Sequence, residues 1–247
     1  MTHAAHASLL PLRDLNGRRV VVIGVGKVGR SAARFAKHHG ANVVLLDDRA
    51  ADEALRGADG LDDLSVVNDW DNFDFKADDI VALSPGVPRR RQGVQRAIDA
   101  DATLVHELEL AAAHLDLDVV IGITGTNGKS TTTALLGRIL EEHVDEKDLF
   151  VGGNLGPTLG DAWLAGQRPK VLALELSSYQ LETMRHLRFD AVGLTNLAPD
   201  HLDRYDVIDD YYAAKLNLQK LCVVPAFANA TDATSVETIA SGWQWFN

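Results

Sequence analysis

Short apolar runs alternate with stretches of helical spacing along most of this chain. The first three runs, residues 18–23, 42–46 and 79–83, are rich in Val, Ile and Leu. Residues 31–39 and 92–100 instead carry apolar positions three and four apart, which is typical of amphipathic helices. Strands that alternate with helices predict an α/β fold with a parallel sheet, because a parallel connection needs a crossover.

The alternation continues in the second half of the chain. Four further apolar runs predict a second parallel sheet: residues 118–124, 150–153, 171–176 and 189–196. A helical pattern over residues 106–115 leads directly into the first of these runs, so we place a domain boundary there. The two predicted domains are residues 1–115 and 116–247. Residues 51–78 are acidic and weakly patterned, and there we expect turns and short elements only.

A complete G-x-G-x-x-G pattern, Gly24 to Gly29, follows the first predicted strand. The second strand ends in Asp47 and Asp48, so an acid stands where a Rossmann-like dinucleotide-binding domain places one. This pattern does not separate NAD from another nucleotide diphosphate. Either acid could equally be a solvated strand end.

The run over residues 79–83 ends in Ser84-Pro85-Gly86, a tight turn. Such a turn lies at the carboxyl edge of a parallel sheet, where open α/β folds bind ligands. The arginines at 89–91 follow it. They could contact phosphate, but a solvated charged face explains them as well.

The strongest local signal is the junction from the strand at 118–124 into a second glycine-containing loop. Its glycines let several backbone N–H groups point inward, and the following helix adds the partial positive charge of its N-terminus. Lys129 adds a full charge, and the hydroxyl of Ser130 is a ligand for Mg²⁺. The P-loop pattern G-x-x-x-x-G-K-[ST] fails at one position, where Ile123 replaces its first glycine. We predict an ATP phosphate site formed by Gly125, Thr126, Asn127, Gly128, Lys129, Ser130 and Thr131.

Composition limits the partners of this chain. It has 247 residues, of which 46% are hydrophobic and 24% charged, and a net charge of −11. The overall field therefore repels nucleic acid and anionic membranes, so bound phosphate must be held by a local site. No segment approaches the ~18 consecutive apolar residues of a membrane span, and the one cysteine, Cys222, excludes an internal disulfide. We expect a cytoplasmic protein.

Two of the later strands each deliver one metal-capable side chain to the edge that carries the phosphate loop. Glu175 ends one strand, and His201 follows the next. With Ser130 and ATP oxygens, these side chains could complete the coordination of Mg²⁺, which prefers oxygen ligands. Taken singly, Glu175 is as readily a paired core acid and His201 a turn histidine.

Four motifs in this order resemble the Mur ligases of peptidoglycan synthesis. They are Gly125-Thr126-Asn127-Gly128-Lys129-Ser130, Gly152-Gly153-Asn154-Leu155-Gly156, Glu175-Leu176-Ser177-Ser178-Tyr179-Gln180-Leu181-Glu182, and residues 196–205, Asn-Leu-Ala-Pro-Asp-His-Leu-Asp-Arg-Tyr. The resemblance covers residues from about 18 to 225. It implies that the second domain is a P-loop-type ATPase domain and that the first binds the UDP part of a substrate.

The resemblance also implies roles for particular residues. The UDP site would be lined by Lys27, Val28, Asp47, Asp48, Arg49, Ser84 and Gly86. Asn154 and His201 would lie near the muramoyl-alanine end of the substrate. Lys215 matches a lysine that the family carbamylates into a metal-binding carboxylate, which suits a site with one or two Mg²⁺ ions. The catalytic residues would be Lys129, His201 and Lys215.

The implied reaction is the ATP-dependent joining of D-glutamate to UDP-N-acetylmuramoyl-L-alanine through an acyl phosphate, and we expect a monomer. The third domain of these ligases has no counterpart in the sequence, and residues after 224 carry no clear family pattern. We therefore expect an incomplete central domain and a weakly active or inactive chain. Two alternatives stay open: a nucleotide-binding remnant without ligation and, from the first domain alone, an NAD-dependent oxidoreductase.

Overall fold

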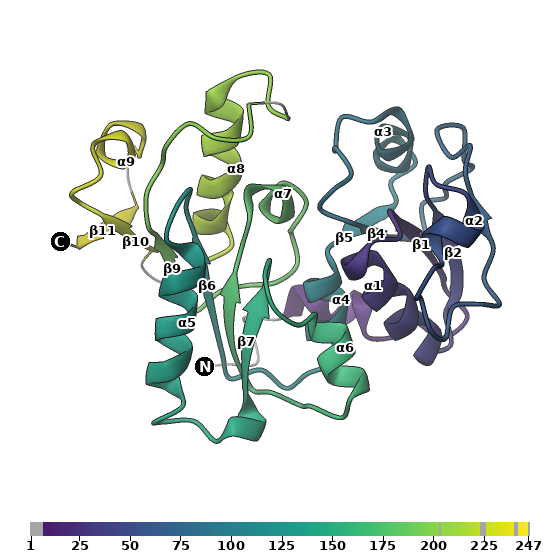
Figure 1. Ribbon diagram of the computed structural model, residues 1–247, viewed down its shortest axis with the longest axis horizontal. Coiled ribbons are helices and arrows are strands. Elements are labelled where there is room, and N and C mark those ends of the chain that lie inside the picture. Colours follow the sequence, from purple (N-terminus) through teal and green to yellow (C-terminus); the bar gives the residue numbers. More distant parts are fainter. Residues whose placement is uncertain (1–6, 203, 223–225, 240–241, 247) are drawn as a thin grey trace.

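A computed structural model describes residues 7–202, 204–222, 226–239 and 242–246 of the chain. It contains two α/β domains side by side, each built on its own parallel sheet (Figure 1). The predicted fold class, two parallel-sheet domains, is therefore confirmed. Within the described residues, no helix combines the length and the apolar character needed to cross a bilayer.

The first sheet has the strand order β3-β2-β1-β4-β5. Its strands are β1 (Arg19–Ile23), β2 (Asn42–Leu46), β3 (Val66–Val67), β4 (Ile80–Leu83) and β5 (Thr103–Val105), and its helices are η1 (Ala7–Leu12), α1 (Lys27–His38), α2 (Ala51–Ala54) and α3 (Gln92–Asp99). Side chains on both faces of β1 are buried, as expected when helices cover both faces of a parallel sheet. The strand order reverses between β1 and β4, and such a switch point is where α/β sheets bind ligands.

The second sheet has the order β11-β10-β9-β6-β8-β7, with all of its pairs parallel. Its strands are β6 (Val119–Thr124), β7 (Leu149–Gly153), β8 (Val171–Glu175), β9 (Ala191–Leu194), β10 (Ala226–Asn229) and β11 (Trp243–Phe246). Its helices are α5 (Lys129–Leu140), η2 (Glu146–Asp148), α6 (Leu159–Leu164), α7 (Ser178–Leu181), α8 (Ile208–Lys220) and α9 (Ala233–Thr238).

We expected no clear family pattern after residue 224, and the structure shows regular elements in this segment. After residue 225 it forms β10, α9 and β11, and the two strands extend the second sheet beyond β9. Ala226, Ala228 and Trp243 are buried there. Neither strand is a continuous buried run like those earlier in the chain, because β10 buries only alternate residues and the edge strand β11 buries only Trp243.

Helix α4 (Glu107–Ala112) lies at the junction of the two domains, between β5 of the first sheet and β6 of the second. Residue 115, where we predict the domain boundary, follows α4 and precedes β6. Helix α6 of the second domain packs against α1 and α4 (Figure 1). One hydrophobic cluster runs through the junction and includes Phe35, Leu110 and Leu159. The two domains therefore share a core.

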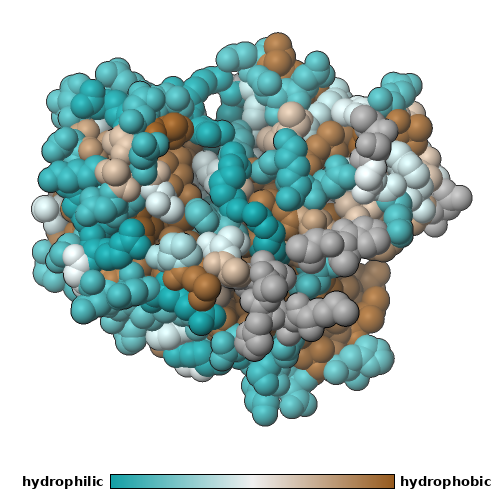
Figure 2. Space-filling model, turned by 180° about the vertical axis from the view of Figure 1, so that it is seen from behind, coloured by the Kyte–Doolittle hydropathy of each residue, from teal (hydrophilic) through white to brown (hydrophobic). Residues whose placement is uncertain are grey.

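The surface of the molecule is mixed in hydropathy. Seen from behind, hydrophilic residues cover much of the molecule, and hydrophobic residues show in patches between them (Figure 2). Helix α5 contributes two exposed apolar side chains, Leu135 and Ile139.

Candidate active site

The second glycine loop joins β6 to α5 and has the backbone that a phosphate site needs. Gly125 has a φ of 144°, and a Cβ there would lie 1.9 Å from Thr195 Oγ1, so only glycine fits. Gly128 has a φ of 80° and stands immediately before α5. Asn196 holds the loop from β9, because its side-chain oxygen accepts a hydrogen bond from Asn127 N (3.0 Å). The loop leads directly into the first turn of α5, and the backbone N–H groups of a first helical turn can bind phosphate.

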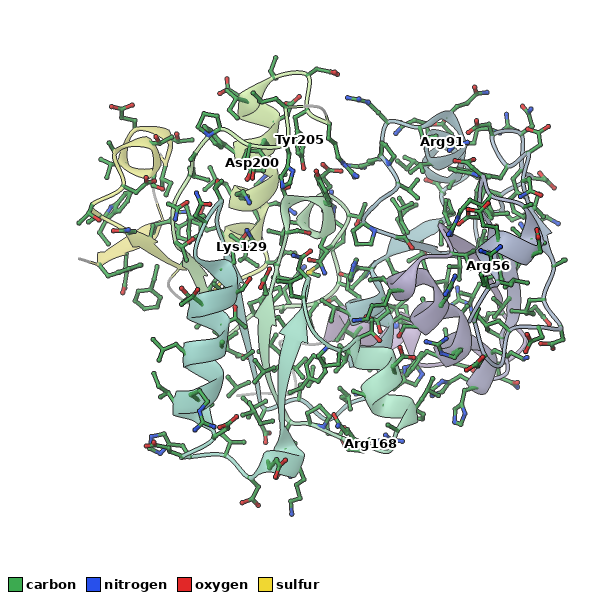
Figure 3. The ribbon with its side chains drawn as sticks, viewed as in Figure 1. Arg56, Arg91, Lys129, Arg168, Asp200 and Tyr205 are labelled. Carbon is green, nitrogen blue, oxygen red and sulfur yellow. The ribbon has the colours of Figure 1, made fainter. Side chains whose placement is uncertain are left out.

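Two lysines donate hydrogen bonds to carbonyls of this loop. Lys129 Nζ donates to Thr126 O (2.8 Å), and Lys215 Nζ donates to Gly125 O (2.7 Å). Figure 3 shows Lys129 at the upper end of α5, below the loop that carries Asp200. Lys215 comes from α8 and is only 2% exposed. Burial, together with the nearby charge of Lys129, lowers the pKa of Lys215 to about 7.

Glu175 lies next to the loop at the end of β8. It pairs in register with Ile123 of β6, two residues before Gly125, and its side chain is nearly buried (3% exposed). Its Oε1 accepts a hydrogen bond from Asn154 Nδ2 (3.0 Å), so the metal candidate and the substrate candidate are in contact. A buried carboxylate beside a phosphate loop is a suitable ligand for a hard cation.

His201 and Ser130 are exposed at the same edge of the sheet, and the structure does not bring them into contact with Glu175. His201 has a φ of 53°, and its ring lies 5.0 Å from that of Tyr179 and 5.8 Å from that of Tyr211. Across the described ranges, no group of three or more His, Cys, Asp or Glu side chains is arranged to hold a metal. The oxygen ligands of Ser130 and Glu175 would fit Mg²⁺ only together with oxygens of a bound nucleotide.

The glycine loop of the first domain is closely packed. A Cβ on Gly29 would lie 1.9 Å from Gly24 O, so the third glycine of the pattern lets α1 approach the loop. Ser84 follows β4 and donates its hydroxyl proton to the same carbonyl, Gly24 O (2.6 Å). The loop after β1 is thereby bonded to the turn after β4, at the switch point of the sheet.

The two acids after β2 have different surroundings. Asp47 is buried, and its carboxylate accepts hydrogen bonds from Val25 N (2.6 Å) and from the Arg49 guanidinium (2.8 Å). Burial alone would raise the pKa of Asp47, but these bonds outweigh it and lower the pKa to about 2. Asp48 instead pairs with Arg91 and accepts a hydrogen bond from Trp70 Nε1 (3.1 Å). Neither acid is a free strand end.

A cleft of about 350 Å³ runs between the two domains. It is lined by Gly24, Gly26, Lys27, Val28, Asp47, Arg49, Ser84, Pro85, Gly86, Val87, Asn154 and Gln180. The predicted UDP-site residues therefore lie together, except for Asp48, which faces Arg91. Asn154 of the second domain joins them, and His201 does not line the cleft. Lys27 also reaches across the junction, since its Nζ donates to Gly156 O (2.5 Å).

Two lining residues received no role in the sequence analysis: Val87 and Gln180. Gln180 is the clearest omission. It sits in the motif that begins with Glu175, and its side chain accepts a hydrogen bond from Ser177 N (2.9 Å) as part of a capping box that starts α7. The Ser-x-x-Gln spacing is a helix-start signal that our sequence analysis did not use, and only the structure places this residue in the cleft.

Two protein-family models match the chain. The MurD-like N-terminal domain of Mur ligases matches residues 18–106, and the Mur ligase middle domain matches residues 123–242. The chain belongs to the Mur ligase family. Within it, the first domain is of the MurD-like kind. The match also corrects our limit of about residue 225, since the middle domain extends through β10 and α9.

Curated relatives point the same way. The chain is 43% identical over 208 residues to the UDP-N-acetylmuramoylalanine–D-glutamate ligase of Anaeromyxobacter dehalogenans, covering 83% of the chain and 44% of the relative. It is 38% identical to the protein of that name from Phenylobacterium zucineum, over 84% and 45% of the two chains. The chain thus spans about half the length of the curated relatives that it matches.

Solved structures support the fold alone. The UDP-N-acetylmuramate:L-alanyl-gamma-D-glutamyl-meso-diaminopimelate ligase of Neisseria meningitides matches with a TM-score of 0.55 at 17% identity, covering 93% of this chain and 77% of that one. A murein peptide ligase of Psychrobacter arcticus matches with a TM-score of 0.50 at 18% identity, over 93% and 52%. No oxidoreductase is among these neighbours or the relatives above, so the family match does not favour the NAD alternative.

Proposed function

We propose that this chain carries the UDP-substrate and ATP sites of a ligase that joins D-glutamate to UDP-N-acetylmuramoyl-L-alanine. The cleft carries the proposal, because its walls come from both domains and Asn154 in its wall binds Glu175 beside the phosphate loop. The names of the curated relatives supply the substrates. We further propose that the chain acts as a monomer in the cytoplasm, where ATP is supplied.

The first domain would hold the UDP group. The amides of the Gly24–Gly29 loop and the N-terminus of α1 favour a diphosphate, and Lys27 adds a positive charge at the entrance of the cleft. A substrate that extends from this loop toward Asn154 would place its carboxylate near Glu175 and the phosphate loop. In this arrangement one ligand contacts both domains.

The second domain would activate that carboxylate. A carboxylate is a poor acyl donor because oxide does not leave. Attack of one carboxylate oxygen on the γ-phosphorus of ATP expels ADP and forms an acyl phosphate. The amine of D-glutamate then attacks the acyl carbon, phosphate leaves, and the amine loses a proton. Lys129 would stabilise charge on the transferred phosphoryl group, and bound Mg²⁺, held through Ser130 and Glu175, would neutralise phosphate oxygens.

Lys215 would serve as a carbamylated side chain, formed when its neutral amine adds to CO₂ and releases a proton. Two observations support this part of the proposal. Lys215 is buried 2.7 Å from Gly125 O, and its pKa is lowered to about 7, so much of it is the neutral, nucleophilic amine. The product is an anion and would be a second carboxylate ligand for Mg²⁺ at the phosphate loop.

Phosphate release tests the proposal. The purified chain is given ATP and Mg²⁺ with both substrates, with each substrate alone, and with neither, and the product is identified by mass spectrometry. We expect phosphate release that needs UDP-N-acetylmuramoyl-L-alanine and is lost in the Lys129→Ala variant. Binding of both ligands without phosphate release would instead identify a nucleotide-binding protein that does not ligate.

The ligand of the first domain is tested separately by thermal unfolding. A ligand that binds only the native state raises its melting temperature by mass action. We expect UDP-N-acetylmuramoyl-L-alanine to raise it and NAD to leave it unchanged. Stabilisation by NAD alone would revive the oxidoreductase alternative.

A further inference from the structure

Helix α4 carries two buried acids in its first turn, Glu107 and Glu109. Their exposed fractions are 3% and 0%, and neither lines the cleft or the phosphate loop. A buried carboxylate lowers stability unless hydrogen bonds replace its lost hydration. The groups that bind these two acids therefore indicate what they do.

Glu107 is bonded to both domains through a single oxygen. Its Oε1 accepts a hydrogen bond from Ser31 Oγ in α1 (2.8 Å) and another from Gly160 N in α6 (2.5 Å). A Cβ on Gly160 would lie 2.8 Å from Glu107 Oε1 and 2.8 Å from Ser31 Oγ, so glycine is needed for this approach. Helices of the two domains thus meet at one carboxylate.

Glu109 makes a second bridge, to a loop of the second domain. Its Oε1 accepts hydrogen bonds from the consecutive amides of Arg185 (2.7 Å), His186 (2.5 Å) and Leu187 (3.1 Å). Its other oxygen accepts a bond from His106 N (2.9 Å), at the start of α4. Consecutive amides that converge on one oxygen form an anion-binding nest, and here the anion is part of the chain.

Both bridges hold elements that form the cleft. Ser31 lies one helical turn after Lys27, and Gly160 lies just beyond Gly156, the two residues that meet across the junction. The loop held by Glu109 follows α7, the helix that carries Gln180. The two acids of α4 therefore connect to the first wall through α1 and to the second wall through α6 and α7.

We propose that Glu107 and Glu109 are positioning residues that fix the spacing between the two walls of the cleft. Apolar side chains would fill the same space without a desolvation cost, and the hydrophobic cluster at the junction already supplies apolar contacts, so cohesion alone does not explain two buried acids. Hydrogen bonds are directional and set one spacing. The inference rests on the proposed function, because the spacing matters when a single ligand contacts both walls.

Spin labels on the two domains test the spacing without any ligand. The labels are placed at the exposed positions Asp62→Cys and Glu142→Cys in a Cys222→Ser background, and the distance distribution is measured by pulsed electron paramagnetic resonance. We expect Glu107→Leu to broaden the distribution of distances between the two labels. Glu107→Gln should keep the distribution narrow, because its amide oxygen accepts the same two bonds. Asp52→Leu, at an exposed first-turn acid of α2, is the matched control.

Calorimetry adds a measurement that a merely structural role would not produce. Glu107→Leu loses both hydrogen bonds and should bind UDP-N-acetylmuramoyl-L-alanine about tenfold more weakly, as expected if only about a tenth of the molecules keep the spacing that one ligand across both walls requires. UDP alone and ATP alone each contact one domain, so their affinities should stay within about twofold of the original, well below that tenfold loss. Equal weakening of all three ligands would mean that Glu107 only supports the fold, and would overturn the proposal.

The outcomes separate the two proposals. If the chain binds no UDP ligand, the proposed function fails, and the label distances still decide whether α4 sets the spacing. An unchanged distribution in Glu107→Leu refutes the positioning role even if ligation is observed. Should Glu107→Leu not fold, Ser31→Ala removes one of the two bonds to Glu107 and must broaden the distribution to a smaller extent, or the inference is wrong.

Discussion

The two glycine loops of this protein share a local pattern but have opposite charges behind them. In the first domain an acid lies behind the loop: Asp47 accepts the amide proton of Val25. In the second domain two amines lie there: the Lys129 ammonium and the buried Lys215 amine donate to carbonyls of the loop. The two loops share the order strand, glycine turn and helix, but they differ in the side chains that surround them.

This difference bears on which phosphate each loop can hold. The Asp47 carboxylate uses one loop amide and adds negative charge, so the first loop suits a diphosphate whose sugar or base supplies further contacts. The second loop has the positive charge of Lys129 beside it, and its Asn127 amide donates to the neutral side chain of Asn196 instead of to an acid, which suits the higher charge of a triphosphate. A glycine pattern therefore predicts a phosphate site, whereas the side chains behind it select the ligand.

The largest effect should come from replacing the glycine that the second loop needs most. Gly125→Ala places a Cβ 1.9 Å from Thr195 Oγ1 at a φ of 144°. We expect it to lower the free energy of unfolding by about 3 kcal/mol or more, since strain and overpacking add. Urea denaturation measures this loss. Gly128→Ala is the control, because its Cβ would meet no atom within 4 Å and only its φ is strained. Equal losses would refute the packing argument.

A lysine exchange tests whether the two loops bind different ligands. Lys129→Ala should weaken ATP binding by about 1.5–3 kcal/mol, at least tenfold, because it removes a charge-assisted contact to phosphate. Lys27→Ala in the first domain should leave ATP affinity unchanged and weaken the UDP ligand. Isothermal titration calorimetry compares the two variants. If Lys129→Ala binds ATP as well as the original chain, the second loop is not the ATP site.

In CO₂-free buffer, where Lys215 stays an uncarbamylated amine, its burial predicts a rise of stability with pH. The folded state lowers the pKa of Lys215 from its usual 10.5 to about 7, so between these values the unfolded chain binds the extra proton. Stability should therefore increase by about 2 kcal/mol from pH 7 to about pH 9. Lys215→Met should lose this increase, and Lys220→Met, at an exposed position of α8, should keep it. The midpoint of urea denaturation is measured for each chain from pH 7 to about pH 9. A midpoint that does not change with pH in the original chain would contradict the burial of a free amine.

The buried acid of the first loop predicts a loss of stability at low pH. The pKa of Asp47 falls from 3.8 to about 2 on folding, so its contribution is present above the unfolded value and is lost as pH falls through this window. We expect the Asp47 carboxylate to contribute about 1 kcal/mol to the free energy of unfolding, and this contribution should be absent in Asp47→Asn. Acid unfolding followed by circular dichroism measures it, with Asp52→Asn as the control. Identical acid midpoints for Asp47→Asn and the original chain would show that Arg49 does not stabilise this carboxylate.

Sequence periodicity predicted most strands of both sheets, because their buried runs are continuous. Helix ends were less accurate. We expected the first helix to begin at Ser31, and α1 begins at Lys27, inside the glycine pattern. The helical pattern over 106–115 gives an α4 that ends at Ala112, since its boundaries depend on contacts with η1, α1 and α6. Residues such as Asp48 and His201 stand beside the right motifs, but the structure places Asp48 against Arg91 and His201 at an exposed turn.

The sequence by itself determined the two parallel sheets, the two glycine loops and the family, because strand burial, turn chemistry and motif spacing are local properties. Only the tertiary structure decided which side chains share the cleft, that Asp47 is enclosed by Arg49 and Val25, and that one oxygen of Glu107 joins α1 to α6. Those contacts unite residues far apart in the chain. Their distances depend on how the two sheets pack at α4, and no local pattern of residues encodes that packing.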